Sequence, residues 1–250
     1  MKKITSLLIC IAFGAFLATA VSDLPAVGDA SSPANMGTAA YYLSHSLSDS
    51  NVPNVVTSVL ADYRGFDTMF ETAVVFVASI GIFAILRRRR KPKETHAKGV
   101  DADKPSLILQ VGCRFMVAPM QLFALYVVAH GHHSPGGGFQ GGVILGASLI
   151  LLAMSYNLKT AFKKLSEKMT IALVAIGVLI YSGIGTYCIK LGGNFLDYSV
   201  WASLLPHTDS VMARSHGMLG VEVGVALTVM SAMYLIYASL SSDGTMDKGL

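Results

Sequence analysis

Three acidic side chains that lie within apolar stretches of the chain are the strongest candidates for chemistry. Asp67 and Glu71 are four residues apart, a spacing that places them on one face of a helix, and Glu222 lies between Gly220 and Gly224. A carboxylate in a membrane span costs a few kcal/mol and therefore faces protein or a water-filled cavity. Burial also favours its neutral form, so it can carry a proton or a cation. We expect these acids to line an ion pathway; the alternative is that they join helices as hydrogen-bond or salt-bridge partners.

Arg114 is the basic counterpart of these acids, about two turns into the apolar stretch 106–129. Arginine keeps its proton, so it cannot relay one; it can hold a carboxylate or shape the field around an ion path. The sequence leaves both roles open. In the topology given below, Arg114 lies closer to the cytoplasm than Glu71 or Glu222. A direct contact with either acid would therefore need a tilted helix or a partner subunit.

A histidine- and glycine-rich segment connects the apolar stretches 106–129 and 139–156. Its histidines, His130, His132 and His133, suggest a metal or haem, but no carboxylate or cysteine accompanies them, so we expect neither a metal nor a cofactor. No Gly-Lys-Ser/Thr follows the glycines, which argues against a phosphate loop. Glycines allow close backbone approach, so a tightly packed turn is the better interpretation. This packing loop comprises Pro135, Gly136, Gly137, Gly138, Phe139, Gly141 and Gly142.

The elements that must position these residues are six apolar stretches, each long enough or nearly long enough to cross a bilayer. A hydrocarbon core about 30 Å thick needs about 20 helical residues. If six helices cross with both termini in the cytoplasm, 15 of the 19 Lys and Arg residues lie on the cytoplasmic side. The sequence therefore predicts an all-α, polytopic membrane bundle of six transmembrane helices. The stretches are 4–21, 66–86, 106–129, 139–156, 169–188 and 217–240.

A basic tract that contains two prolines, 87–104, divides the chain. It predicts a cytoplasmic linker between a two-helix unit, 1–95, and a four-helix unit, 96–250. The first apolar stretch, 4–21, has two interpretations from its pattern. Two lysines, an apolar run and Ala-Thr-Ala fit a cleaved secretory signal, and the same residues fit a retained membrane helix.

The remaining connections fall on alternate sides of the membrane. Residues 22–63 are polar and external, and within them Ser32 would cap a short helix that begins at Pro33. Residues 159–164 are expected to form the second cytoplasmic loop, and residues 192–215 the last external loop.

Composition excludes several classes of protein. With 53% hydrophobic and 14% charged residues, the chain is no ordinary water-soluble domain. The net charge of +4 comes from residues near helix ends, and no basic surface with interleaved aromatic residues suggests nucleic acid. The three cysteines lie within apolar stretches without ligand spacing, so disulfides and a zinc site are not expected.

Two sequence strings give the chain a family resemblance. Asp-Tyr-Arg-Gly-Phe-Asp-Thr at 62–68, with Glu71, resembles the E subunit of membrane-bound hydrogenases and the last part of the A subunit of Mrp-type Na⁺/H⁺ antiporters. Pro-Gly-Gly-Gly-Phe-Gln-Gly-Gly at 135–142, with 217–228, resembles the B subunit of those antiporters (MnhB). In this chain the two units are joined, which departs from complexes in which they are separate subunits.

The resemblance implies a membrane subunit that is not an enzyme, retains its first helix and sits in the cell inner membrane. Its implied partners are other membrane subunits of an Mrp-like antiporter, the bilayer, and Na⁺ and H⁺ as transported ions. No lysine lies in any predicted span, so the chain does not resemble the pumping subunits of such complexes. Two alternatives stay open: a scaffold in a related respiratory complex, such as a membrane-bound hydrogenase, and a haem or metal protein that uses the histidines.

Overall fold

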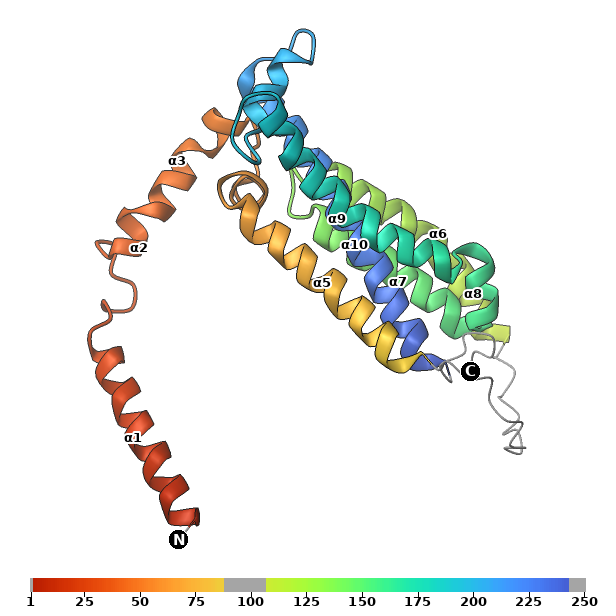
Figure 1. The fold of residues 1–250 in the computed structure, drawn as a ribbon, viewed down its shortest axis with the longest axis horizontal. Coiled ribbons are helices and arrows are strands. Elements are labelled where there is room, and N and C mark those ends of the chain that lie inside the picture. Colours follow the sequence, from red (N-terminus) through yellow and green to blue (C-terminus); the bar gives the residue numbers. More distant parts are fainter. Residues whose placement is uncertain (1, 88–106, 243–250) are drawn as a thin grey trace. The chain divides into compact units, whose positions relative to one another are not determined.

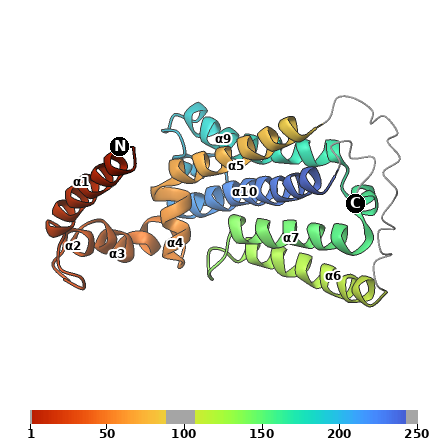
Figure 2. The ribbon, with the colours of Figure 1, turned by 90° about the horizontal axis from the view of Figure 1, so that it is seen from below.

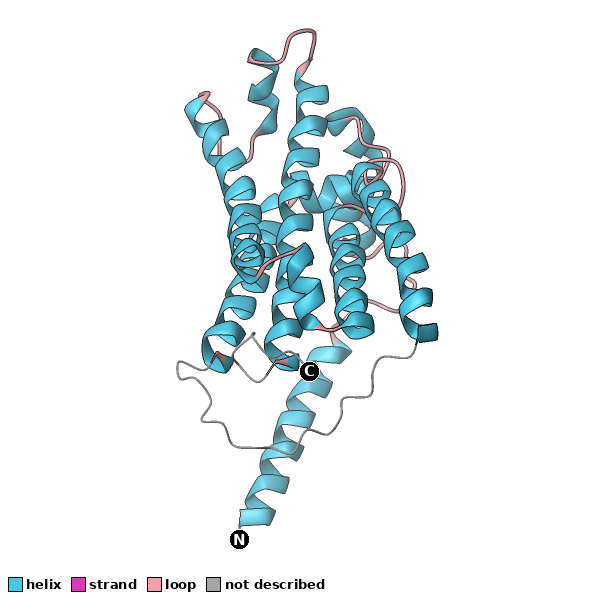
Figure 3. Ribbon diagram, turned by 90° about the vertical axis from the view of Figure 1, so that its right-hand side faces the viewer, coloured by secondary structure: helices cyan, strands magenta, loops and turns pink. Residues whose placement is uncertain are grey.

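Every regular element that the structure, a computed structural model, describes within residues 2–87 and 107–242 is helical (Figure 3). Six helices among these residues are long and apolar enough to cross a membrane. They coincide with the six predicted stretches, so the prediction of an all-α polytopic bundle is confirmed. They are α1 (Lys2–Ser22), α5 (Gly65–Leu86), α6 (Leu107–Ala129), α7 (Gly138–Tyr156), α9 (Glu167–Lys190) and α10 (Ser210–Ser241).

The chain forms two compact units, Met1–His45 and Ser46–Leu250. The first contains α1 and the expected short helix, which begins at Pro33 as predicted. The Ser32 side chain, however, makes no capping hydrogen bond. The helix is also interrupted after one turn at Gly37, which separates α2 (Pro33–Met36) from α3 (Thr38–Ser50).

The predicted division into units 1–95 and 96–250 lies outside the described residues and stays a prediction. The same holds for Arg88–Arg90 and most of the predicted basic linker. Within the second compact unit, the helix that precedes this linker packs with those that follow it: α5 contacts both α9 and α10.

The second unit is an antiparallel bundle organised around α10 (Figures 1 and 2). Helices α5, α7 and α9 pack directly against α10, whereas α6 packs chiefly on α7. Small residues allow the closest approaches, because Gly177 of α9 faces the carbonyl of Gly224 and Gly142 of α7 faces Ala226. α10 therefore contributes more buried residues than any other helix described in the unit.

The start of α10 corrects the sequence prediction. The helix begins at Ser210 rather than near Gly217, so the last residues of the predicted external loop are helical. Asp209 provides the reason, because its Oδ1 accepts a hydrogen bond from the Met212 backbone N–H at 2.7 Å and thereby caps the helix. The extra turns carry Arg214, which contributes to the site described below.

Two of the predicted loops also contain short helices. The expected loop at 159–164 contains α8 (Leu158–Lys164), which the Asn157 side chain caps by accepting from the Thr160 N–H at 2.8 Å. The 192–215 segment contains a 3₁₀ turn, η2 (Tyr198–Ser203). The turn is capped by Asp197. In both places a local side-chain cap supplies the order that apolar periodicity could not reveal.

Charge is distributed unequally between the two ends of this bundle. Arg87, at the end of α5, forms an ion pair with Glu167, at the start of α9, with 2.7 Å between Nη1 and Oε1. The lysines of α8 and of the first turn of α9 lie at the same end. The opposite end holds the histidine- and glycine-rich turn, η2 and the segment before α5 (Figure 1).

Candidate functional site

Glu222 is a buried acid near the end of the bundle that carries the glycine-rich turn. Its residue is 8% exposed, and its Oε2 is buried without a hydrogen-bond partner among the described residues. Bare glycine backbone surrounds the carboxylate: a Cβ added at Gly137 would lie 2.7 Å from Oε1, and one added at Gly131 would lie 2.9 Å from Oε2. The packing loop and Glu222 were identified separately in the sequence, and the structure brings them together.

The shape of this turn depends on glycine at two positions. Gly137 has φ of 114°, a conformation that side chains disfavour. Its N–H donates to the Val127 carbonyl at 3.2 Å, which holds the turn against the end of α6. Gly138 begins α7 directly against the backbone of Glu222, where an added Cβ would overlap the carbonyl oxygen.

A cavity of about 600 Å³ opens beside Glu222 and also reaches Glu71 of α5. Glu71 is exposed, whereas Glu222 is enclosed, so the two acids offer an outer and an inner carboxylate along one cavity. The hydroxyl of Tyr181 lies at its wall and donates to the Gly65 carbonyl at 2.9 Å. Other polar lining residues are Asn54, Thr57, Thr68 and Gln140.

The segment before α5 clamps the glycine-rich turn. The Asn54 backbone N–H donates to the His132 carbonyl at 3.0 Å, and its Nδ2 donates to the carbonyls of Gly131 and Ser134 at 2.8 and 2.9 Å. The Thr57 hydroxyl also donates to Gly131, at 2.7 Å. No signal in the sequence indicated this contact, because its partners lie more than 70 residues away.

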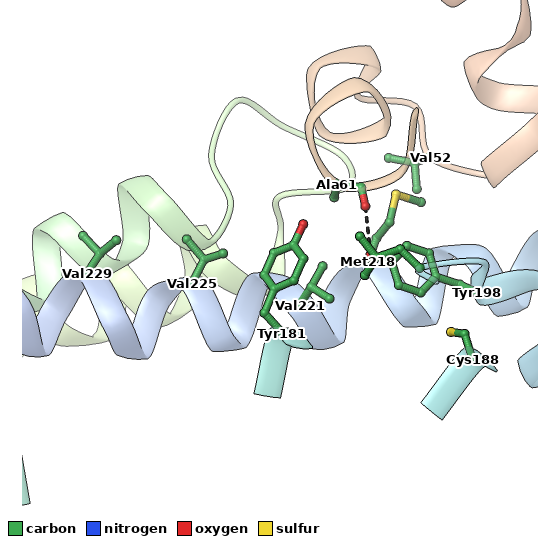
Figure 4. Packing of buried hydrophobic residues seen from close by; sticks show 10 residues of the cluster. Val52, Ala61, Tyr181, Cys188, Tyr198, Met218, Val221, Val225 and Val229 are labelled. Atoms are coloured by element: carbon green, nitrogen blue, oxygen red, sulfur yellow. Dashed lines mark hydrogen bonds between the residues drawn. The ribbon is translucent and has the colours of Figure 1, made fainter. Parts of the chain in front are cut away.

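Buried tyrosines fix the π-helical turn at Val59–Tyr63, which leads into α5 (Figure 4). The Tyr198 hydroxyl donates to the Ala61 carbonyl at 3.0 Å, and both residues are buried in the same cluster as Tyr181 and Met218. Burial raises the pKa of Tyr198, so its hydroxyl stays a donor. These contacts anchor the start of α5, and hence Glu71, to α9 and η2.

Asp67 does not share the cavity of Glu71 and Glu222, although it lies one turn from Glu71. It pairs with Arg64, three residues before it. Both line a second cavity of about 580 Å³, together with Asp62, Asp197 and Arg214. The structure thus places Asp67 at a different cavity from Glu71 and Glu222, and a shared ion pathway of the three acids stays a prediction.

The second cavity contains an ion pair that the sequence did not reveal. Arg214 of α10 donates to Asp62 Oδ2 from Nη2 at 2.7 Å and from Nε at 2.8 Å. The Asp62 side chain is 7% exposed and that of Arg214 27%. Burial raises the pKa of Asp62, and the Arg214 guanidinium opposes this shift. No local spacing signals a pair whose members are 152 residues apart.

Replacing Asp62 with asparagine is expected to lower the melting temperature of the purified membrane complex, because Arg214 would lose its carboxylate. Removing one partner of a buried ion pair costs about 3 kcal/mol or more, less where a partner is partly exposed. Asp67→Asn is the matched control: it breaks an exposed pair that contributes at most about 1 kcal/mol. Equal melting temperatures for the two variants would contradict this account.

Arg114 lies apart from both cavities. It is exposed on α6 and makes no ion pair with any carboxylate in residues 2–87 or 107–242. Neither cavity includes it. An ion pair of Arg114 with an acid of this chain is thus absent from the described residues, and both roles left open for it stay predictions.

The three histidines have different surroundings. His130 stacks on Tyr126 with ring centroids 4.6 Å apart. His132 Nδ1 lies 3.3 Å from the Ser215 hydroxyl of α10, and burial lowers the pKa of His132 from its ordinary value of 6.5. In the described part of the chain, no three His, Cys, Asp or Glu side chains gather as metal ligands. The turn therefore links α6 to α10 and to the segment before α5.

Two family models match this chain. One, described as a domain related to the MnhB subunit of Na⁺/H⁺ antiporter, matches residues 108–235. The other, described as the E subunit of MBH, matches residues 1–102. The resemblances inferred from the two sequence strings are thus confirmed.

Curated relatives are components of antiporters. The chain is 27% identical over 222 residues to the A/B subunit of a probable K⁺/H⁺ antiporter of Rhizobium meliloti, covering 81% of this chain and 22% of the relative. It is 31% identical over 134 residues to the B subunit of the Na⁺/H⁺ antiporter of Bacillus subtilis, covering 51% of this chain and 92% of the relative. The chain therefore spans about a fifth of the first relative and nearly all of the second.

Two solved membrane complexes contain chains of similar fold. One is a chain of the Mrp complex from Dietzia sp., which is 26% identical to this chain with a TM-score of 0.66. The match covers 99% of this chain and 26% of that chain. The other is a chain of the archaeal membrane-bound sulfane sulfur reductase, a respiratory complex. It is 25% identical to this chain with a TM-score of 0.65, and the match covers 94% of this chain and 98% of that chain. The chain of the reductase complex thus matches both units of this chain together.

Proposed function

This chain belongs to the family of domains related to the MnhB subunit of Na⁺/H⁺ antiporters, and from this premise we propose that it is a non-catalytic membrane subunit of a multisubunit monovalent cation/proton antiporter. It is a multi-pass membrane protein, and we place both termini on the cytoplasmic side of the cell inner membrane. The basic residues at the Arg87 end of the bundle support this orientation. Its partners are the other membrane subunits of the assembly.

The observation that carries the proposal is the enclosed carboxylate of Glu222, whose Oε2 has no hydrogen-bond partner among the described residues. A charged carboxylate held in low dielectric without a partner is unfavourable, so the site favours a bound proton or cation. The cavity that connects it to Glu71 provides an opening for that ion. We therefore propose Glu71 and Glu222 as successive carboxylates on the ion route, with Asp67 outside it.

A second role is supported by a specific observation. The chain of the sulfane sulfur reductase matches this chain over nearly its whole length. The alternative is thus a membrane-arm component of a respiratory complex that acts only as a scaffold for the other subunits. Under this alternative, both carboxylates are structural and the chain carries no ion.

The test compares inverted membrane vesicles that contain the complete complex with vesicles from cells that lack only this chain. Proton exchange is followed with a fluorescent ΔpH probe after addition of Na⁺, K⁺ or a neutral osmolyte. We expect a cation-dependent proton flux that disappears without the chain and returns with a plasmid copy. Proton flux that follows an electron donor and is indifferent to the cation would support the respiratory alternative instead.

A further inference from the structure

One side of α6 carries a polar stripe in an otherwise apolar helix. Gln110, Arg114 and Gln121 are four and seven residues apart, spacings that place them on one side of a helix. This side borders α7, because the Gln121 amide donates to the Ser148 hydroxyl at 3.2 Å and the Tyr156 hydroxyl donates to the Gln110 carbonyl at 3.4 Å. Arg114 lies between these two contacts, yet it is exposed.

Within the described part of the second unit, no helix packs over the Arg114 side chain, which is exposed although α7 lies beside it. α6 lies at the edge of the bundle, with α7 as its main neighbour (Figure 2). Arg114 is the eighth residue of a 23-residue helix, about 10 Å along the axis from its first residue. A guanidinium at this depth stays charged and costs about 2.5–3.5 kcal/mol in hydrocarbon even on the lowest scales.

Arg114 contrasts with the exposed apolar residues of α6. Met116, two residues further along the chain, projects about 200° around the helix from Arg114, and it is exposed and apolar, as is Phe123. Lipid suits these apolar side chains and does not suit the guanidinium of Arg114. A charged side chain in a membrane span is normally paired within protein.

We propose that the side of α6 centred on Arg114 is a contact surface for another membrane subunit, whose helix supplies an Asp or Glu to the guanidinium. The planar guanidinium offers a fork of donors that matches a carboxylate. This inference rests on the proposed function only in assuming an assembly of membrane subunits. It adds the face of the chain that the partner covers and the charge that the partner carries.

The test places a photo-reactive amino acid at Ala118, an exposed residue one turn beyond Arg114 on the same side, within the assembled complex. We expect a cross-link to another subunit, with an Asp or Glu within one helical turn of the cross-linked position by mass spectrometry. The same probe at Met116 should not reach that peptide. Adducts formed only with phospholipid at position 118, or a partner peptide without an acid, would overturn the proposal.

A charge exchange provides the second arm. Arg114→Asp should lower the amount of that partner that co-purifies, Arg114→Lys should retain most of it, and replacing the partner's cross-linked acid with lysine should restore binding to Arg114→Asp. Unchanged co-purification of Arg114→Asp would contradict the proposed pair. If cross-linking and charge exchange succeed in a complex that exchanges no cation, the proposed function fails while this surface stands.

Discussion

Replacing Gly138 with alanine is expected to prevent this protein from entering its complex. A Cβ at this position would overlap the carbonyl oxygen of Glu222, and both groups belong to the backbones of packed helices. Neither can move aside as a flexible side chain would, so the first turn of α7 must separate from α10. Overpacking costs about 1–3 kcal/mol, and the upper part of this range is expected here because both clashing groups are backbone. Co-purification with the other membrane subunits, by native gel, measures the loss.

Gly183→Ala is the matched control for this variant. Gly183 also lies in a membrane-length helix, but a Cβ added there meets no atom within 4 Å. Both variants add one methyl group and both favour the helix. We expect Gly183→Ala to assemble as the wild type does; assembly of Gly138→Ala at the same level would refute the close contact between the glycine-rich turn and Glu222.

Replacing Glu222 with glutamine is expected to reduce cation-dependent proton exchange in inverted vesicles to background and to leave the complex assembled. Glutamine has nearly the same shape as glutamate, so the glycine backbone of Gly131 and Gly137 still fits around it. Glutamine cannot take up or release a proton, and it offers a neutral amide where a cation would meet a carboxylate. If Glu222 only supports helix packing, the same substitution removes a buried charge and leaves the exchange rate unchanged.

Apolar length and charge asymmetry predicted the six membrane helices well, because both properties are local in the sequence. The end of α10 near Arg214 was misplaced, since the polar residues before Gly217 carry no apolar signal. The cap at Asp209 extends the helix there. Side-chain caps of this kind decide where a helix begins without changing its average hydropathy.

The candidate site was only partly predictable. Glu222 and the glycine string were each conspicuous in the sequence. Their contact, however, joins residues about 85 positions apart, and no local spacing in the sequence signals such a contact. The pairing of Asp62 with Arg214 was hidden for the same reason. Helical spacing placed Asp67 one turn from Glu71, but it could not show that Asp67 pairs with Arg64 and lines a different cavity.

The most direct test of the central claim measures Na⁺-dependent proton exchange for the wild type and for Glu222→Gln at matched amounts of assembled complex. Ser231→Ala serves as the control, because it removes another buried, unpartnered oxygen from α10. If Glu222 carries the ion, Glu222→Gln exchanges at background and Ser231→Ala near the wild-type rate. Wild-type exchange by fully assembled Glu222→Gln would contradict this role and leave this chain a scaffold.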